Sequence, residues 1–140
     1  MKVLIVEDSR LVVERLKDIV REVPGYEIAG TARDVGGSSR LVPELKPDVI
    51  VLDLNIPGGG GLEVLRSVKG SEPRTVVIVL TNYVSIPVRD ACFQAGADFF
   101  LDKSNEFARL PGVLAQIGRD SGLGPCQGMD SEPIRRKATA

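Results

Sequence analysis

Five short hydrophobic segments alternate with helix-like stretches along most of the chain. Two of these segments, residues 49–52 and 76–80, are apolar at every consecutive position. Continuous apolar runs of this length are typical of parallel strands that are buried on both faces, whereas a half-exposed strand alternates apolar and polar residues. The pattern therefore predicts an α/β protein built on a parallel sheet.

The boundaries of the elements follow from turn residues and helix caps. Ser9 is a good N-cap for the first helix, Pro24 stops that helix, and Pro43 should bend or end the last turn of the second. The predicted strands cover about residues 2–7, 26–32, 48–53, 75–80 and 98–102. The predicted helices cover about residues 10–23, 34–45, 62–68, 85–95 and 110–118, with a loop or short turn at 104–109.

These elements account for one domain, residues 1–119. Its predicted fold is flavodoxin-like, an open parallel five-stranded sheet of order 2-1-3-4-5 with helices on both faces. From residue 120 the composition changes to Gly, Pro, Ser and charged residues with few large apolar side chains. We therefore predict a flexible C-terminal tail at 120–140.

Composition excludes several classes of function. The 18 Lys and Arg residues nearly balance the 19 Asp and Glu residues, so the net charge of −1 gives little support for DNA binding. No apolar run is long enough to span a membrane, and the two cysteines, in a chain without a secretory signal, are expected to be reduced, which favours the cytoplasm. Histidine is absent. This excludes a Ser-His-Asp triad, a histidine zinc site and a phosphohistidine on this chain.

Polar groups stand at the ends of four of the five strands. Glu7 and Asp8 follow the first strand, Asp53 ends the third, Thr81 follows the fourth and Lys103 follows the fifth. In an open parallel sheet the functional crevice lies beyond the carboxyl ends of the strands, where the strand order reverses. We therefore expect these five side chains to converge on one site.

The three carboxylates of this site should repel one another. One like-charge pair about 4 Å apart costs roughly 4 kcal/mol at an effective dielectric constant of about 20, so the cluster needs a proton or a divalent cation. An acidic, all-oxygen, partly open site suits Mg²⁺, which commonly binds substrate phosphate as well. Lys103 and Thr81, expected on the far side of Asp53, could then surround a phosphoryl group bound to that carboxylate, with Asp53 as the nucleophile.

The motifs at these strand ends resemble those of the CheY-like receiver domains of bacterial two-component response regulators. The matching segments are VLIVEDS, PDVIVLDLNIPGGGGLEVL, VIVLTNY and AGADFFLDKS. Each segment alone is a weak signal, but their order and spacing together are highly specific. The resemblance covers residues 2–118.

This resemblance implies a phosphorylation-dependent switch rather than a metabolic enzyme. The phosphoryl donor would be a sensor histidine kinase or a histidine phosphotransfer protein, and the output would be a downstream protein, with a phosphorylation-dependent homodimer as a further option. The face made by the fourth helix, fifth strand and fifth helix would change shape. The implied roles are phospho-acceptor for Asp53, Mg²⁺ ligands for Glu7, Asp8, Asp53 and the backbone carbonyl of Asn55, switch hydroxyl for Thr81, phosphoryl pairing for Lys103, and switch aromatic for Phe100.

Several positions depart from the usual pattern of that family. Gly60, preceded by Gly59, stands where an aspartate is common, so the third helix loses a side-chain cap. Ser104 replaces the usual proline after the lysine, and Asn82 replaces a small residue after Thr81. Tyr83 lies where it could shield the phosphoryl group from water. We expect these differences to affect the lifetime of the phosphorylated state.

Two other functions remain open from the sequence. A Mg²⁺-dependent phosphatase of haloacid-dehalogenase type has a similar order of an aspartate after an apolar strand, a later threonine and a later lysine. Against it, the Glu7-Asp8 pair lies upstream on the first strand, and no second acidic pair follows Lys103. A phosphorylation-independent interaction domain is the other option, and the complete set of acidic, threonine and lysine residues argues against it.

Overall fold

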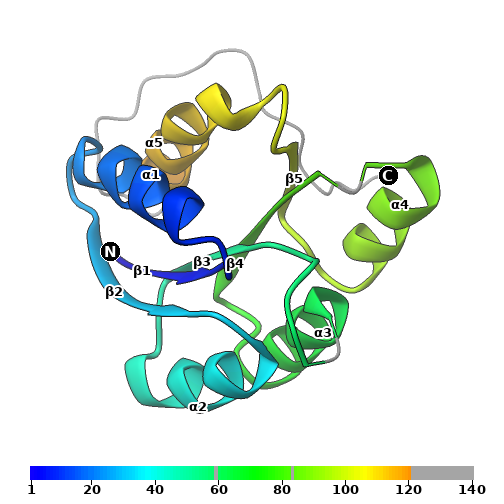
Figure 1. Ribbon diagram of the computed structural model, residues 1–140. Helices are drawn as coiled ribbons and strands as arrows, with labels where there is room; N and C mark the ends of the chain where they lie inside the picture. Colours follow the sequence, from blue (N-terminus) through cyan, green and yellow to red (C-terminus); the bar gives the residue numbers. More distant parts are fainter. Residues whose placement is uncertain (59, 83, 121–140) are drawn as a thin grey trace.

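Five parallel strands form one sheet of order β2-β1-β3-β4-β5, as the apolar runs predicted (Figure 1). The computed structural model describes residues 1–58, 60–82 and 84–120. The strands are β1 (Lys2–Val6), β2 (Glu27–Ala32), β3 (Val49–Leu52), β4 (Val76–Thr81) and β5 (Phe99–Asp102). The helices are α1 (Arg10–Arg21), α2 (Val35–Leu45), α3 (Gly61–Ser71), α4 (Ile86–Gln94), the 3-10 turn η1 (Phe107–Arg109) and α5 (Leu110–Asp120).

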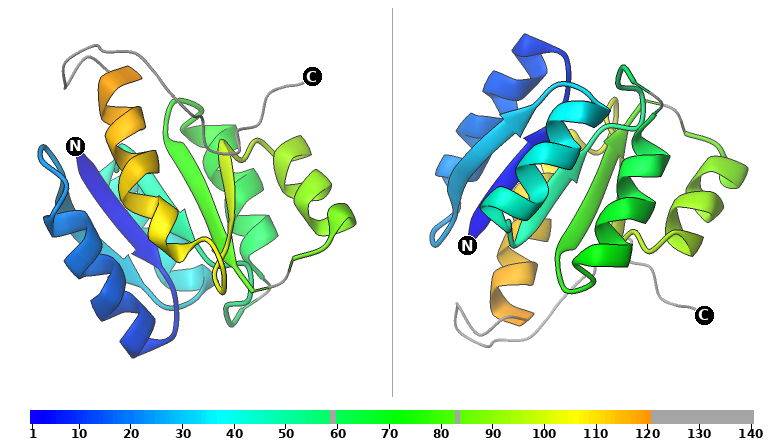
Figure 2. Two further views of the ribbon diagram at one scale, coloured as in Figure 1. Left: turned by 90° about the horizontal axis from the view of Figure 1, so that it is seen from above. Right: turned by 90° about the horizontal axis from the view of Figure 1, so that it is seen from below.

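Helices cover both faces of the sheet, which explains why its central strands β1, β3 and β4 are almost entirely apolar. Helices α1 and α5 lie on one face, and α2, α3 and α4 lie on the other (Figure 2). Along β3, Val51 faces the core under α1 and α5, whereas Ile50 and Leu52 face the core on the opposite side. All four residues of β3 are therefore buried.

The same alternation places two adjacent phenylalanines of β5 in different cores. Phe99 packs on the side of α1 and α5, and Phe100 packs on the side of α4, where its ring centroid lies 6.2 Å from that of Phe93. Both side chains are almost fully buried, at 1% and 3% exposure. Burying two large aromatic rings in β5, at one edge of the sheet, requires helix cover on each face of that strand.

The helix ends agree with most of the sequence signals. The Ser9 hydroxyl accepts a hydrogen bond from the Val12 N–H at the start of α1. Pro43 lies in the last turn of α2, which continues two residues beyond it to Leu45, and the C-cap residue Lys46 has a φ of 48°. This position tolerates proline because Pro43 and Ser39, whose carbonyl loses its helical donor, are both exposed to water.

Some predictions fall outside the described residues. These are the roles of Gly59 and Tyr83 and the flexible tail, except that Asp120 is the last residue of α5. The boundary at residue 119 stays a prediction. Within the described ranges, no helix combines the length and the apolar character needed to cross a membrane.

Candidate functional site

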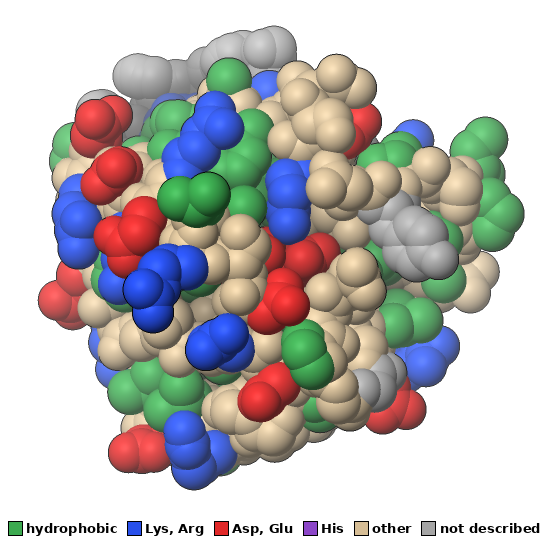
Figure 3. All heavy atoms as spheres, in the orientation of Figure 1, with side chains coloured by type: hydrophobic (Ala, Val, Ile, Leu, Met, Phe, Trp, Pro, Cys, Tyr) green, Lys and Arg blue, Asp and Glu red, His purple; other side chains and the backbone are tan. Residues whose placement is uncertain are grey.

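The carboxyl ends of the strands surround a cleft of about 580 Å³. All five side chains expected to converge are found in its wall. Figure 3 shows acidic side chains in a recess near the centre of this face. The cleft is lined by Glu7, Asp8, Ser9, Val12, Asp53, Asn55, Thr81, Asn82 and Lys103.

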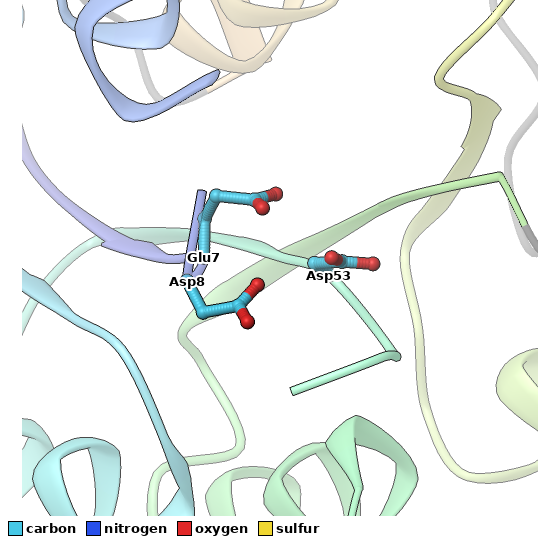
Figure 4. Close-up of side chains that lie close together, drawn as sticks. All are labelled: Glu7, Asp8 and Asp53. Atoms are coloured by element: carbon cyan, nitrogen blue, oxygen red, sulfur yellow. The ribbon is translucent and has the colours of Figure 1, made fainter. Parts of the chain in front are cut away.

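The sheet order brings the acidic residues together. Because β1 lies beside β3, the residues that follow these two strands lie next to each other at the carboxyl ends. The Asp53 N–H donates to the Val6 carbonyl at 3.0 Å. Glu7, Asp8 and Asp53 each offer a carboxylate oxygen within 4.8 Å of the others (Figure 4). Glu7 and Asp53 are buried, at 3% and 6% exposure, whereas Asp8 is exposed at the rim.

Lys103 lies between the two buried carboxylates. Its Nζ donates to Glu7 Oε1 at 2.9 Å and to Asp53 Oδ2 at 3.2 Å. From the sequence, a proton or a divalent cation was expected to compensate the carboxylate cluster, with the lysine on the far side of Asp53. The ammonium group is a third form of compensation, and its contact with Glu7 was not predicted. The available signal was the burial cost of a glutamate that directly follows a fully apolar strand.

The electrostatic setting of the lysine differs from that of the glutamate. Burial raises the pKa of Glu7, and this effect outweighs the hydrogen bonds that Glu7 accepts from Lys103 and from the Ser9 N–H. Burial acts to lower the pKa of Lys103, but its hydrogen bond to Glu7 and the negative charge of Asp53 outweigh that effect, so the pKa of Lys103 is raised. The lysine is therefore held in its charged form beside Asp53.

The other predicted site residues differ in their distance from the cleft. Thr81 lies at the end of β4 and lines the cleft, almost fully buried. Asn55 also lines it, and its N–H donates to Asp53 Oδ1 at 3.2 Å, which orients that carboxylate. The role of the Asn55 carbonyl as a metal ligand stays a prediction. Phe100 is not among the residues that line the cleft, because its side chain packs against Phe93 under α4.

The acidic group fits a small hard cation. It supplies three carboxylates within reach of one another, with Asp8 exposed at an open cleft so that further ligands can be water or phosphate oxygens. Mg²⁺ prefers oxygen ligands of this kind and retains several waters. The donor set therefore matches the metal that the sequence predicted.

Comparison with known proteins matches most of the chain to one protein family. Residues 3–115 match the family model described as the response regulator receiver domain. The chain is 32% identical over 117 residues to response regulator GacA of Pseudomonas aeruginosa, and this match covers 84% of the chain and 55% of GacA. The chain thus spans about half the length of the GacA proteins that it matches.

One protein and one separately solved domain match over nearly their whole length. Chemotaxis protein CheY of Thermotoga maritima is 28% identical over 118 residues, which is 84% of this chain and 98% of that protein. The crystal structure of the response regulator domain of Thermotoga maritima CheB superposes with a TM-score of 0.76 at 28% identity, covering 89% of this chain and 98% of that one. The strand order, the acidic cleft and these matches agree: the chain belongs to the response regulator receiver domain family.

Proposed function

We propose that Asp53 accepts the phosphoryl group in this receiver domain. The observation that carries the proposal is the position of its carboxylate, which is buried at a strand end, lines the cleft and lies 3.2 Å from the Lys103 ammonium. A carboxylate oxygen of Asp53 attacks the phosphorus of the donor, and the bond between phosphorus and the donor's imidazole nitrogen breaks. The product is an aspartyl phosphate on this chain.

The neighbouring side chains have complementary roles in this proposal. Lys103 pairs with a phosphoryl oxygen, and the Thr81 hydroxyl donates to another. Glu7, Asp8, Asp53 and the Asn55 carbonyl would hold Mg²⁺, which when bound supplies positive charge against the phosphoryl oxygens. Lys103 already neutralises part of the negative charge around Asp53, so the acceptor is accessible to an anionic donor.

Signalling would follow from the movement of Thr81 toward the phosphoryl group. We propose that Phe100 follows this movement and that the face made by α4, β5 and α5 changes its shape. In support, Phe100 packs against Phe93 of α4, so a shift of the Phe100 ring changes a packing contact of that helix. The proposed downstream reader of that face is a protein, with homodimerisation as a second outcome, and DNA contact by this domain is not part of the proposal.

The phosphoryl donor in this proposal is a sensor histidine kinase or a histidine phosphotransfer protein. Because such a kinase draws its phosphoryl group from ATP, the exchange would take place in the cytoplasm. The domain would have no metabolic substrate, only self-phosphorylation and slow hydrolysis of its own aspartyl phosphate. The family match over residues 3–115 does not favour the haloacid-dehalogenase-type phosphatase or a phosphorylation-independent domain.

Incubation with acetyl phosphate, with and without Mg²⁺, tests this proposal through intact-mass measurement. We expect the wild type to gain one phosphoryl group only when Mg²⁺ is present, and Asp53→Asn to gain none. Asp18→Asn, at an exposed position of α1, is the matched control and should behave as the wild type does. Equal phosphorylation of Asp53→Asn would refute the proposal, and sustained turnover of sugar phosphates would support the phosphatase instead.

A further inference from the structure

A hydrogen bond joins the loop after β4 to the loop after β5, next to the cleft's threonine and lysine. Asn82 directly follows Thr81, and Ser104 directly follows Lys103. The Ser104 hydroxyl donates to Asn82 Oδ1 at 2.9 Å, although the two residues are 22 positions apart. Asn82 lines the cleft, so this bridge lies at its mouth.

Ser104 is itself firmly held. Its N–H donates to Asp102 Oδ1 at 2.9 Å, and the Asn105 side chain donates to Asp102 Oδ2 at 3.0 Å. The Asp102 N–H in turn donates to Glu106 Oε1 at 2.8 Å. These hydrogen bonds to and from Asp102 fix the conformation of the loop after β5, and with it the position of the Ser104 hydroxyl.

This support gives the Asn82 amide a defined orientation. Its oxygen, the only acceptor of that side chain, is engaged by Ser104, so its NH₂ end points away from the serine. Beside it, the Lys103 N–H donates to the Thr81 carbonyl at 2.9 Å, which ties the two loops together at the backbone as well. A held amide of this kind directs its NH₂ donors toward an anion, and the Ser104 hydroxyl occupies one of the two lone pairs of its oxygen.

Hydrolysis of an aspartyl phosphate needs a water molecule that can reach the phosphorus atom. The water oxygen attacks phosphorus, the bond between phosphorus and the Asp53 oxygen breaks, and both water protons leave on the inorganic phosphate. An acceptor at the mouth of the cleft would orient this water, whereas donors would bind the phosphoryl oxygens and obstruct its approach. Building on the proposed function of Asp53, we infer that Ser104 positions Asn82 as a cover over the phosphoryl group and prolongs the phosphorylated state.

The test measures the loss of phosphoryl mass after removal of acetyl phosphate, in the full chain with Mg²⁺. We expect Ser104→Ala to hydrolyse faster by about threefold to tenfold, the range that corresponds to one hydrogen bond. Ser104→Thr keeps the hydroxyl and should retain the wild-type rate. Ser71→Ala, an exposed serine of α3 far along the chain, is the matched control and should also leave it unchanged.

A double-mutant cycle separates a bridge from two independent effects. Asn82→Ala should also speed hydrolysis, and Ser104→Ala should add nothing in the Asn82→Ala background. The inference is overturned if Ser104→Ala hydrolyses at the wild-type rate, or if it accelerates hydrolysis equally in both backgrounds. If the wild type takes up no phosphoryl group at all, the proposed function of Asp53 fails and the inference fails with it, which is a distinct result.

Discussion

Glu7 is the side chain whose environment opposes its charge most clearly. It is buried directly after β1, and its two oxygens are contacted by the Lys103 ammonium at 2.9 Å and the Ser9 N–H at 3.1 Å. Burial nevertheless dominates and raises the pKa of this carboxyl. Such a group costs stability when it is ionised, and the cation proposed for this site would offset that cost.

The raised pKa of Glu7 predicts a pH-dependent effect of Glu7→Gln in Mg²⁺-free buffer. A folded-state pKa above 4.5 means that the folded wild type takes up a proton more readily than the unfolded chain. The stability from this group is therefore complete below pH 4.5 and is lost as the pH rises through the folded-state pKa. We expect Glu7→Gln to be more stable than the wild type at pH 7, with a smaller difference at pH 4.5.

Urea unfolding with EDTA at a series of pH values from 4.5 to 7 measures this difference. Glu14→Gln makes the same chemical change at an exposed position of α1 and is the matched control. A flat profile for Glu7→Gln, or a variant that is less stable than the wild type at pH 7, would contradict the prediction.

At the scale of elements, the start of α3 constrains the loop that carries Asp53. Gly60 is the N-cap with a φ of 98° and no side-chain cap, as its sequence position predicted. Gly61 approaches the backbone after Asp53 so closely that an added Cβ would lie 2.6 Å from the Asp53 carbonyl oxygen. This connection therefore depends on glycine for space as well as for conformation.

We predict opposite effects for two glycine-to-alanine changes in α3. Gly61→Ala should destabilise the fold by about 1–3 kcal/mol, because backbone must move, and should slow phosphorylation of Asp53. Gly70→Ala adds a Cβ with no heavy atom within 4 Å near the other end of the helix. It should stabilise the protein by about 0.5–1 kcal/mol through helix propensity.

Chemical unfolding and the rate of phosphorylation by acetyl phosphate measure both effects. Normal phosphorylation of a fully stable Gly61→Ala variant would show that the loop accommodates the clash. Gly70→Ala serves as the control, because it makes the same chemical change in the same helix without touching the cleft.

At the scale of the whole molecule, two lysines join distant parts of the chain at opposite ends of the sheet. Lys103 pairs with Glu7 and Asp53 at the carboxyl ends of the strands. Lys69 pairs with Asp98 at 2.8 Å and donates to the Thr75 carbonyl near the amino ends of β5 and β4. Both lysines are largely buried, so they are matched in burial but only one lies at the site.

We predict that Lys103→Met lowers the thermal unfolding midpoint without metal and increases the stabilisation by added Mg²⁺. Without the ammonium, Glu7 and Asp53 repel each other in the apo protein, and a divalent cation relieves a larger penalty. Lys69→Met should also lower the midpoint, but its Mg²⁺-dependent shift should equal that of the wild type. Thermal melts over a Mg²⁺ titration, reversed with EDTA, measure both shifts, and equal shifts for all three proteins would contradict the prediction.

The predicted domain boundary can be tested on the same scale. α5 contributes buried residues to the core up to Gly118 and ends at Asp120. We expect a chain that ends at residue 120 to unfold at the same temperature as the full chain and to take up phosphoryl groups at the same rate. A lower midpoint for the shorter chain would show that residues 121–140 contribute to the stability of the domain.

The sequence by itself determined the parallel sheet, its element boundaries to within a few residues and the five strand-end side chains that line the cleft. A strand that is buried on both faces has a continuous apolar run such as residues 49–52. A polar residue that follows such a run lies at the end of its strand, where the sheet meets solvent. These signals are local. They were sufficient to place Asp53, Thr81 and Lys103 together once the strand order was predicted.

Only the tertiary structure decided which of these side chains are partners. Lys103 contacts Glu7 across 96 positions, Ser104 contacts Asn82 across 22, and Phe100 faces α4 while Phe99 faces the other core. Such pairings depend on the conformation of each side chain and on competition between charges in a shared low-dielectric space. Neither is recorded in the spacing of residues along the chain.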